Sequence, residues 1–554
     1  MQAHRYRPIP PVDLPDRQWP GRTLSAPPRW CSVDLRDGNQ SLVEPMGWDR
    51  KVAFFETLLK VGFTEIEVGF PAASQTDFDF IRRLIEEDRI PEGVAIQVLT
   101  QAREPLIART IEALQGARRV ILHLYNSTSA LQRRVVFGQD RKAILAMALQ
   151  GTRWVKEAAR DLKGAEIIFE YSPESFSATE LDFAAEVCDA VVETWNPSAP
   201  GEMILNLPNT VEMASPNHYA DQIEWMHRHL KRRDQVQLSL HAHNDRGCAV
   251  AATELGLLAG ADRVEGTLFG NGERTGNADL VTLALNLLMN GVDPGLNLGD
   301  LPELVRVFEH CNRLPVSPRH PYAGELVFTA FSGSHQDAIK KGLAALKSEG
   351  RMDWEVPYLP LDPADVGRMY ESIIRINSQS GKGGVAYILE EAYGFVLPKE
   401  LAAEFSGRVQ GLADASGEEL VPERIWRAFE AEYLLPGRYA LGDYNAHSQG
   451  PEHCQVQAQL EDHGRALQVA GSGKGPIDAF VKGLNQHLGL GLHVRHYHEH
   501  ALGDGEDAEA VAYVQVQLAE GRTGHGVGRD ADISAASFKA LLSALNRMEG
   551  TTRS

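Results

Sequence analysis

The sequence predicts an α/β protein that begins with a closed (β/α)₈ TIM barrel, continues through a helical linker subdomain, and ends in an α+β domain. Its 554 residues are too many for one hydrophobic core, so two or three domains are expected. Over residues 30–305, short apolar and β-branched runs alternate with stretches of helical periodicity. The eight runs match a closed barrel in number and spacing. An open doubly wound sheet is the competing architecture, with its ligand at a switch point.

The expected strands and helices of the barrel follow one another along the chain. The strands are expected at residues 31–35, 65–70, 95–99, 119–124, 166–171, 203–207, 237–240 and 263–269. The helices are expected at residues 50–61, 77–87, 143–162, 180–194, 219–231 and 249–258. This alternation of strands and helices is typical of a parallel sheet built from βαβ units.

The segments on either side of the barrel have a different character. Residues 1–29 carry seven prolines, which exclude a helix or a central strand and predict an extended arm. That arm is expected either to be a loose tail or to lie on another subunit. Residues 306–435 contain helical patterns near 335–346 and 366–376 and no strand rhythm, so a mostly helical linker is expected there.

The last segment, residues 436–554, repeats one pattern twice. Strand-like runs are followed by a glycine-rich stretch, at 471–475 and again at 526–528, and then by a helix. This order predicts two copies of a small α+β module. We expect the first glycine-rich stretch, like 270–276 in the barrel, to form a tight turn, because neither spacing matches a dinucleotide fingerprint or a P-loop.

Composition and charge exclude several classes of partner. Lys and Arg total 55 against 75 Asp and Glu, a formal net charge of −20. A basic surface for nucleic acid or for an anionic membrane is therefore not expected. No apolar stretch approaches the ~20 residues of a membrane span, and the first residues lack the apolar core of a secretory signal. The five cysteines are widely spaced, which suits a cytoplasmic protein without a disulfide scaffold.

Polar side chains cluster directly after the expected strands, where a TIM barrel carries its active site. His241 and His243 are two residues apart at the end of the seventh strand, so both imidazoles face one side. Asp37, after the first strand, would complete a site of two histidines and one carboxylate for a divalent metal, and Asn277 could add a neutral oxygen. An isolated pair of this spacing is more often structural, but its coincidence with Asp37 and Asn277 at one rim favours the metal.

Two further side chains are candidates for catalysis. Arg36 is next to Asp37 and could stabilise an oxyanion that develops on a carbonyl beside a metal. The alternative for Arg36 is a salt bridge at the barrel rim. Glu174, after the fifth strand, is either a general base or a surface carboxylate.

Four motifs in the barrel together resemble those of the 2-isopropylmalate synthases, which are Claisen-condensing members of the DRE-TIM metallolyase superfamily. These motifs are Leu35-Arg-Asp-Gly-Asn-Gln40, Val68-Gly-Phe-Pro71, Leu240-His-Ala-His-Asn-Asp-Arg-Gly247 and Gly270-Asn-Gly-Glu-Arg-Thr-Gly-Asn277. Residues 331–339 and 377–386 resemble the long type of the family. Homocitrate and citramalate synthases share the barrel motifs, so a related condensing enzyme is an alternative, as is a C–C lyase of the same superfamily.

The resemblance implies a role for each matching position. Its metal ligands fall on Asp37, His241, His243 and Asn277, and its carbonyl-stabilising arginine falls on Arg36. Its keto-acid pocket falls on Leu99, His123, Ser172, Glu174 and Thr210. Its histidine after the barrel, which acts with the acetyl group, falls on His335. The implied cofactor is a divalent metal, Mg²⁺ before Mn²⁺ or Zn²⁺, with K⁺ as an activator.

The resemblance also implies a reaction and its regulation. An acyltransferase of this family condenses acetyl-CoA with 2-ketoisovalerate and water to give 2-isopropylmalate and CoA, the first committed step of leucine biosynthesis. Leu99, Ser172 and Thr210 offer no cation for a second substrate carboxylate, which argues against homocitrate synthesis. A homodimer is implied, in which leucine binds residues 436–554 and inhibits. The alternative is a purely structural dimerisation domain.

Overall fold

The computed structural model describes residues 2, 9–330, 332–368, 382–416, 420–448, 450, 453–503 and 508–550. The chain divides into two compact units. The first comprises Met1–Val327 with Pro363–Arg368, and the second Phe328–Asp362 with Met369–Ser554. Most of the helix expected at 366–376, and part of the motif at 377–386, lie outside the described residues.

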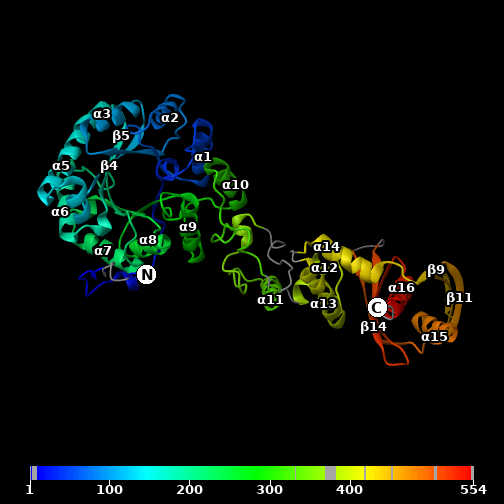
Figure 1. Ribbon diagram of the computed structural model, residues 1–554. Helices are drawn as coiled ribbons and strands as arrows, with labels where there is room; N and C mark the ends of the chain where they lie inside the picture. Colours follow the sequence, from blue (N-terminus) through cyan, green and yellow to red (C-terminus); the bar gives the residue numbers. More distant parts are fainter. Residues whose placement is uncertain are drawn as a thin grey trace. The chain divides into compact units, whose positions relative to one another are not determined.

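The first unit contains the closed barrel that the sequence predicts, and the alternative of an open sheet is wrong. Its eight strands are parallel and pair in chain order, the eighth closing on the first (Figure 1). They are β1 Arg29–Ser32, β2 Glu65–Gly69, β3 Ala95–Gln101, β4 Arg119–Ser127, β5 Glu166–Glu174, β6 Met203–Asn209, β7 Gln237–Ala242 and β8 Arg263–Gly266.

Helices surround these strands (Figure 1). They are α1 Trp48–Val61, α2 Gln75–Glu86, α3 Glu104–Ala113, α4 Ala130–Gln132, α5 Arg141–Ala158, α6 Leu181–Trp195, α7 Pro216–His229, α8 Ala249–Leu258, α9 Leu280–Met289 and α10 Leu301–Asn312. Several begin at a side-chain cap, as α2 does where the Ser74 hydroxyl accepts from the Asp77 amide. The short helix α3 is not among those expected from the sequence; it begins with Pro105 in its first turn.

Two expected strands, 31–35 and 263–269, end three residues earlier than predicted, and both differences lie at the rim. Strand β1 ends at Ser32, and Asp34–Gly38 form a π-helical turn in which the amides of Asp37 and Gly38 both donate to the Val33 carbonyl. Strand β8 ends at Gly266 and is followed by a 3₁₀ turn. Both runs are apolar enough to resemble strand ends, but their backbones form helical turns at the rim and do not continue the strands.

The interior of the barrel contains a charged layer. Arg263 is fully buried and donates to Glu65, Gln97, Ser239 and Glu265 at 2.6, 2.7, 2.8 and 2.9 Å. Alternate residues of barrel strands face inward, so these side chains all meet inside the barrel. An apolar group lies one step nearer the strand beginnings: Ala95, Ile121, Ile168 and Ile204. The barrel therefore has an apolar base beneath a hydrogen-bonded ionic layer.

The described part of the N-terminal arm lies on its own barrel. Arg17 forms a two-pronged ion pair with Asp221 of α7, at 2.8 and 3.0 Å. Trp19 donates its indole N–H to the same carboxylate, and its amide donates to Glu224. Residues 17–19 are therefore not a loose tail, because α7 supplies buried carboxylates to which they bind. A contact of the arm with another subunit stays a prediction.

The second unit is helical and then α+β. Its helices α11 Gly333–Glu349, α12 Lys382–Tyr393, α13 Lys399–Ser416 and α14 Pro422–Phe429 are followed by two modules of three strands and a helix. The first module is β9 Tyr439–Ser448, β10 Cys454–Asp462, β11 Arg465–Gly473 and α15 Pro476–Leu488. The second is β12 His493–Leu502, β13 Glu509–Gln517, β14 Thr523–Asp530 and α16 Ile533–Gly550. The repeat predicted from the sequence is present, with three antiparallel strands in each copy.

The prediction of a turn at 471–475 is wrong for its first three residues, because β11 extends to Gly473 and residues 474 and 475 alone form a bend before α15. Gly471 lies in β11 and Gly526 in β14, each beneath the helix of its module. A Cβ at Gly526 would lie 2.1 Å from the Ala540 carbonyl oxygen and 2.4 Å from the Ala544 amide nitrogen. Glycine is required here because the helix backbone rests directly on the strand.

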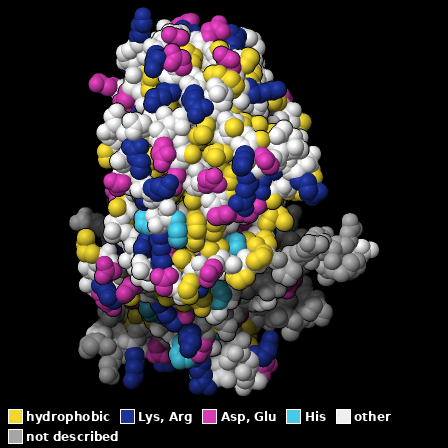
Figure 2. Space-filling view, turned by 90° about the vertical axis from the view of Figure 1, so that its left-hand side faces the viewer, with side chains coloured by type: hydrophobic (Ala, Val, Ile, Leu, Met, Phe, Trp, Pro, Cys, Tyr) yellow, Lys and Arg dark blue, Asp and Glu magenta, His cyan; other side chains and the backbone are white. Residues whose placement is uncertain are grey.

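The barrel side of the surface carries charges of both signs. Figure 2 shows Lys and Arg interspersed with Asp and Glu over this face, with apolar side chains between them. Such a mixture gives no cationic stripe on this face for a nucleic-acid backbone. Across the described residues, no helix combines the length and the apolar character that a membrane crossing requires.

We predict that Gly526→Ala destabilises the second unit by about 3 kcal/mol, because the new methyl group meets helix backbone that cannot yield. Urea unfolding of the full chain measures the change. Gly411→Ala is the matched control: Gly411 lies in α13, and a methyl group added to it would have no atom within 4 Å, so alanine should add up to about 1 kcal/mol of stability. Equal losses in both variants would contradict the packing argument.

Candidate active site

A cavity of about 300 Å³ opens at the carboxyl end of the barrel strands. Nine residues predicted from the sequence line it: Arg36, Asp37, Leu99, His123, Ser172, Glu174, Thr210, His241 and His243. Seven further residues line it as well: Gln40, Phe70, Tyr125, Asn206, Pro208, Glu273 and Arg274. The βα loops and strand ends thus bring together side chains that are far apart in the sequence.

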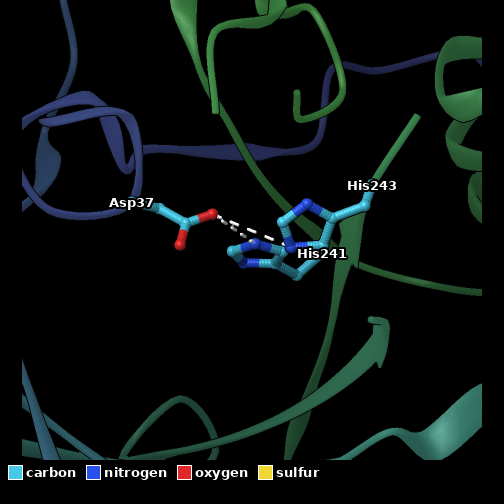
Figure 3. A group of neighbouring side chains, drawn as sticks. All are labelled: Asp37, His241 and His243. Atoms are coloured by element: carbon cyan, nitrogen blue, oxygen red, sulfur yellow. Dashed lines mark hydrogen bonds and ion pairs between the residues drawn. The ribbon is translucent and has the colours of Figure 1, made fainter. Parts of the chain in front are cut away.

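Asp37, His241 and His243 form the centre of this cavity (Figure 3). The Asp37 Oδ2 atom lies 3.3 Å from His241 Nε2 and 3.8 Å from His243 Nε2. One ligand atom from each of the three side chains lies within 4.8 Å of the other two, and all three residues are buried. Two imidazoles and one carboxylate form a donor set for a divalent cation.

The electrostatics of Asp37 and His243 fit a cation, whereas His241 would have to release a proton to bind one. Burial alone would raise the pKa of Asp37, but Arg36 and the two histidines hold it well below its usual range, so the carboxylate is ionised. Although burial opposes it, hydrogen bonds to Asp37 and Glu265 raise the pKa of His241 to about 10. Burial, followed by the charge on His241, lowers the pKa of His243 to about 4. The second imidazole is therefore neutral, as a metal ligand must be.

Asn277 lies beside this group. Its backbone pairs with that of His243 in an isolated antiparallel bridge. The side-chain nitrogen donates to the Asn271 carbonyl at 3.0 Å, whereas the buried side-chain oxygen has no hydrogen-bond partner in the described part of the chain. The Nδ1 atom of His243 is likewise buried and unpartnered there. Both atoms are buried polar groups that call for a ligand or a water.

The turn expected at 270–276 is present and holds Asn277 in place. Gly276 has φ +95°, and a Cβ on it would lie 1.9 Å from the Gly270 carbonyl oxygen. The amide of Asn277 donates to that same carbonyl at 3.0 Å. Only glycine permits this closure, which holds Asn277 beside His243.

Arg36 is a buried part of the cavity wall rather than an exposed rim residue. Its Nη1 atom donates to Asp37 at 2.5 Å, and its Nε atom donates to Glu67 at 2.5 Å. Its relative exposure is 8%. Arg36 therefore forms the salt bridge that the alternative expected, between two buried carboxylates, and it also lines the cavity. Its role in catalysis stays a prediction.

The opposite wall carries the residues predicted for a keto-acid pocket. His123 Nε2 is 2.7 Å from the Ser172 hydroxyl, which also accepts from Asn206 at 3.0 Å. The Thr210 hydroxyl accepts from the Ser175 amide at 2.9 Å. Leu99 is apolar and nearly buried. The wall therefore combines a fixed polar network with one apolar side.

Glu174 and His335 differ in placement. Glu174 lines the cavity at the end of β5, and the Ser127 hydroxyl donates to its Oε2 atom. His335 lies on α11 in the second unit, is exposed, and stacks on Tyr358 with ring centroids 4.0 Å apart. The residues that line the barrel cavity do not include His335. Its predicted role stays a prediction.

Several cavity residues are not among those predicted from the sequence, although a signal exists for most of them. Phe70 belongs to the second of the four barrel motifs, and Glu273 and Arg274 belong to the fourth. Tyr125 is two residues beyond His123 on β4, so alternation places it on the same face. Gln40 is the last residue of the first motif, and it donates to both Asp37 and Glu273 at 3.2 Å and so links two rim loops.

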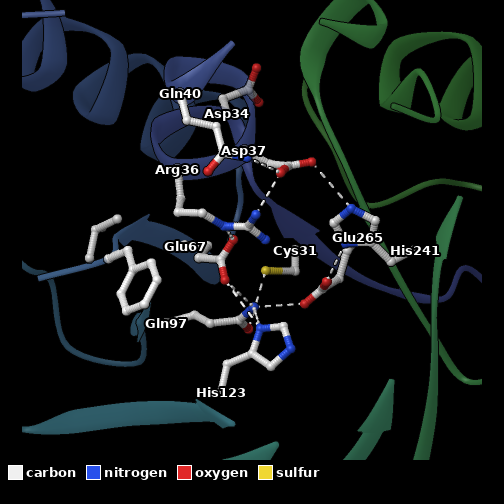
Figure 4. A network of polar contacts seen from close by, with 12 residues as sticks. Cys31, Asp34, Arg36, Asp37, Gln40, Glu67, Gln97, His123, His241 and Glu265 are labelled. Carbon is white, nitrogen blue, oxygen red and sulfur yellow. Dashed lines mark hydrogen bonds and ion pairs between the residues drawn. The ribbon is translucent and has the colours of Figure 1, made fainter. Parts of the chain in front are cut away.

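A buried network below the cavity connects its parts (Figure 4). Glu67 accepts from Arg36 through one oxygen and from His123 Nδ1 at 3.2 Å through the other. Gln97 donates to Glu67 at 3.2 Å and to Glu265 at 2.7 Å. The guanidinium and the pocket imidazole are thus oriented by one carboxylate.

Comparison with known families and proteins follows the same division of the chain. Residues 27–308 match the HMGL-like family, residues 325–390 match "alpha-isopropylmalate synthase, post-catalytic domain-like", and residues 419–549 match the "LeuA allosteric (dimerisation) domain". The fold and the site therefore define an HMGL-like barrel enzyme.

Full-length relatives narrow the class. A 2-isopropylmalate synthase of Rhodospirillum rubrum is 56% identical over 550 residues, covering 99% of each chain. That of a Parafrankia species is 56% identical over 555 residues, covering 99% of this chain and 98% of its own. That of Ralstonia nicotianae is 54% identical over 551 residues, covering 99% and 95%. The chain belongs to the 2-isopropylmalate synthase family, which confirms the resemblance found in its motifs.

We predict that His243→Ala weakens binding of Mn²⁺ to the full chain by about 100-fold or more, because it removes one of three protein ligands. Titration calorimetry measures the dissociation constant, and circular dichroism verifies the fold. His218→Ala, at a histidine of α7 outside the cavity, serves as the control and should bind Mn²⁺ like the wild type. Undiminished binding in His243→Ala would exclude this group as the cation site.

Proposed function

We propose that the chain condenses acetyl-CoA with 2-ketoisovalerate and water to give 2-isopropylmalate and CoA, the first committed step of leucine biosynthesis. The observation that carries the proposal is the cavity itself. One wall carries the buried Asp37–His241–His243 group beside Arg36, and the other carries Leu99. The first wall suits the carboxylate and carbonyl oxygens of a keto acid, and the second suits a short alkyl group.

A divalent cation would be held by Asp37, His241 and His243, with the side-chain oxygen of Asn277 as a further ligand. We assign Mg²⁺ before Mn²⁺ or Zn²⁺, with K⁺ as an activator to which no residue is assigned. Such a cation, when bound, polarises a carbonyl and makes its carbon electrophilic. The ionised carboxylate and the unpartnered oxygen of Asn277 support this assignment.

The side chains of the cavity supply the remaining chemistry. Glu174 accepts a proton from the methyl group of acetyl-CoA, and the resulting carbanion forms a bond to the keto carbon. Arg36 donates to the oxygen that becomes an alkoxide, where its fixed guanidinium is already oriented. Water then cleaves the thioester and releases CoA. We assign His335 a role with the acetyl group.

The alternative activities make different demands on the pocket. A homocitrate synthase must neutralise a second substrate carboxylate. Among the described residues lining the cavity, Arg274 is the cation other than Arg36, and it is already bonded to Asp245 at 2.6 Å and to the Thr210 carbonyl at 2.6 Å. A citramalate synthase differs only in taking a shorter keto acid. A C–C lyase would use the same cation without acetyl-CoA condensation.

We predict that thiol release from acetyl-CoA is fastest with 2-ketoisovalerate. Its kcat/KM should exceed that for pyruvate by about 10-fold or more, since each methylene group in an apolar pocket contributes ~1–3 kcal/mol. Turnover with 2-oxoglutarate should be slowest, because its second carboxylate would face Leu99. The assay measures free thiol with each keto acid at equal concentration. A preference for pyruvate would favour citramalate synthesis, and one for 2-oxoglutarate homocitrate synthesis.

We further propose a homodimer that leucine inhibits through the C-terminal modules. The support is the match of residues 419–549 to an allosteric dimerisation domain, together with two folded modules for which we assign no catalytic residue. Inhibition at a distance requires two states that differ in leucine affinity.

We predict that millimolar leucine lowers turnover of the full chain severalfold and that isoleucine at the same concentration does not, because a site for the pathway product must distinguish branching. Light scattering should give twice the chain mass. A chain truncated near residue 435 tests the location, and it should ignore leucine. A full-length enzyme indifferent to leucine would leave the modules a structural role only.

A further inference from the structure

One carboxylate contacts the proposed cation site from below without lining the cavity. Glu265 lies on β8, is 0% exposed, and its Oε2 atom accepts from His241 Nδ1 at 2.7 Å. Asn206 donates to the same oxygen at 3.2 Å. Gln97 and Arg263 donate to the other oxygen at 2.7 and 2.9 Å. Figure 4 shows Glu265 between this network and His241.

These four donors give the carboxylate a single orientation. Each oxygen faces two of them, so the side chain cannot rotate without leaving buried N–H groups unsatisfied. Because a carboxylate only accepts hydrogen bonds, His241 must carry a hydrogen on Nδ1. Both ring nitrogens face a carboxylate, but the contact of Nδ1 with Glu265, at 2.7 Å, is shorter than that of Nε2 with Asp37, at 3.3 Å. Nε2 is therefore the nitrogen that would release its hydrogen and bind a cation.

We propose that Glu265 is the positioning residue of the cation site: it fixes the tautomer and the ring orientation of His241, so that the Nε2 lone pair points at the cation. Glu265 touches neither the cation nor the substrate and acts through His241. The proposal rests on the cation site of the proposed function. Carboxylates that accept from the far nitrogen of a metal-bound histidine commonly raise metal affinity in this way.

Glu265 is also part of a second group of possible ligands, with His123 and Glu170, whose atoms lie within 4.8 Å of one another. We assign no cation there. Both oxygens of Glu265 already accept two hydrogen bonds each, and His123 Nε2 is bonded to the Ser172 hydroxyl. These hydrogen bonds occupy both oxygens of Glu265 and the Nε2 atom of His123, so Glu170 alone could still offer an oxygen to a cation.

Glu170 provides a matched control for the same layer. It is fully buried, and neither oxygen accepts a hydrogen bond from a donor in the described residues. Burial, the charge of Glu265 and a hydrogen bond to Glu265 raise the pKa of Glu170 well above its usual range, so its carboxyl group is neutral and donates to Glu265, as the NH₂ group of glutamine also can. Glutamine therefore replaces it with little change in charge or shape, and the cation site should be unaffected.

The test compares Glu265→Gln with Glu170→Gln in the full chain. Glutamine at 265 must turn its NH₂ group either toward Gln97 and Arg263 or toward His241. The arrangement that keeps the contact with Arg263 places the NH₂ group opposite Nδ1 of His241. Because both would then be donors, the imidazole hydrogen moves from Nδ1 to Nε2. The dissociation constant for Mn²⁺, measured by electron paramagnetic resonance of free Mn²⁺, should rise about 10- to 100-fold in Glu265→Gln and stay at the wild-type value in Glu170→Gln.

A double-mutant cycle shows whether the effect passes through His241. Adding Glu265→Gln to a His241→Ala background should change Mn²⁺ affinity less than about twofold, because the ring to be positioned is gone. A full additional loss in that background, or an equal loss in Glu170→Gln, would overturn the proposal. Wild-type affinity in Glu265→Gln would overturn it as well. Failure of the wild-type chain to bind Mn²⁺ would instead overturn the cation site itself.

A measurement on the wild type keeps the proposal testable if Glu265→Gln does not fold. Nitrogen-15 spectra of histidine-labelled protein saturated with Mg²⁺ report which ring nitrogen carries hydrogen. The signals assigned to His241, by their absence in His241→Gln, should show hydrogen on Nδ1 and none on Nε2. Hydrogen on Nε2 would overturn the assignment of Glu265.

Discussion

The ionic layer inside the barrel is the constraint on which the rest of the first unit depends. Arg263 is a fully buried cation, and an unpaired charge at such a position would cost several kcal/mol. Glu65, Gln97 and Glu265 therefore have to meet it in fixed positions. Because Gln97 and Glu265 also bond the next layer toward the mouth, the requirement to pair one arginine extends to the side chains that face the cavity.

The rim loops are fixed by a second buried carboxylate. Asp34, in the π-helical turn after β1, accepts from the Leu268 amide in the 3₁₀ turn after β8 through both oxygens, each at 3.1 Å. Burial raises the pKa of Asp34 to about 7, although the hydrogen bond from the Leu268 amide favours the ionised carboxylate. The turns that lead to Asp37 and to Asn277 are thereby tied together.

The barrel and the residues at its rim could be predicted from the sequence, but the layer that supports them could not. Strand ends carry histidines and carboxylates whose spacing is informative, and His241, His243 and Asp37 do converge. Glu65-Ile-Glu-Val, in contrast, has the alternation of a strand with one wet face. In this closed barrel the face that carries the glutamates is the inner one, so Glu67 and, on β8, Glu265 are buried. Alternation shows that residues share a face, and only closure shows which face is inside.

The same limit explains the glycines of the second unit. The sequence pattern is typical of turns at these positions, because a turn is the local reason to use glycine. In the structure the reason is the distance between two backbones: Gly471 faces the Ala479 carbonyl and the Gly483 amide, four residues apart on α15. Gly526 meets Ala540 and Ala544 of α16 with the same spacing. The two modules therefore share a backbone contact while their other side chains differ, which is how a repeat keeps its fold after its sequence similarity has become faint.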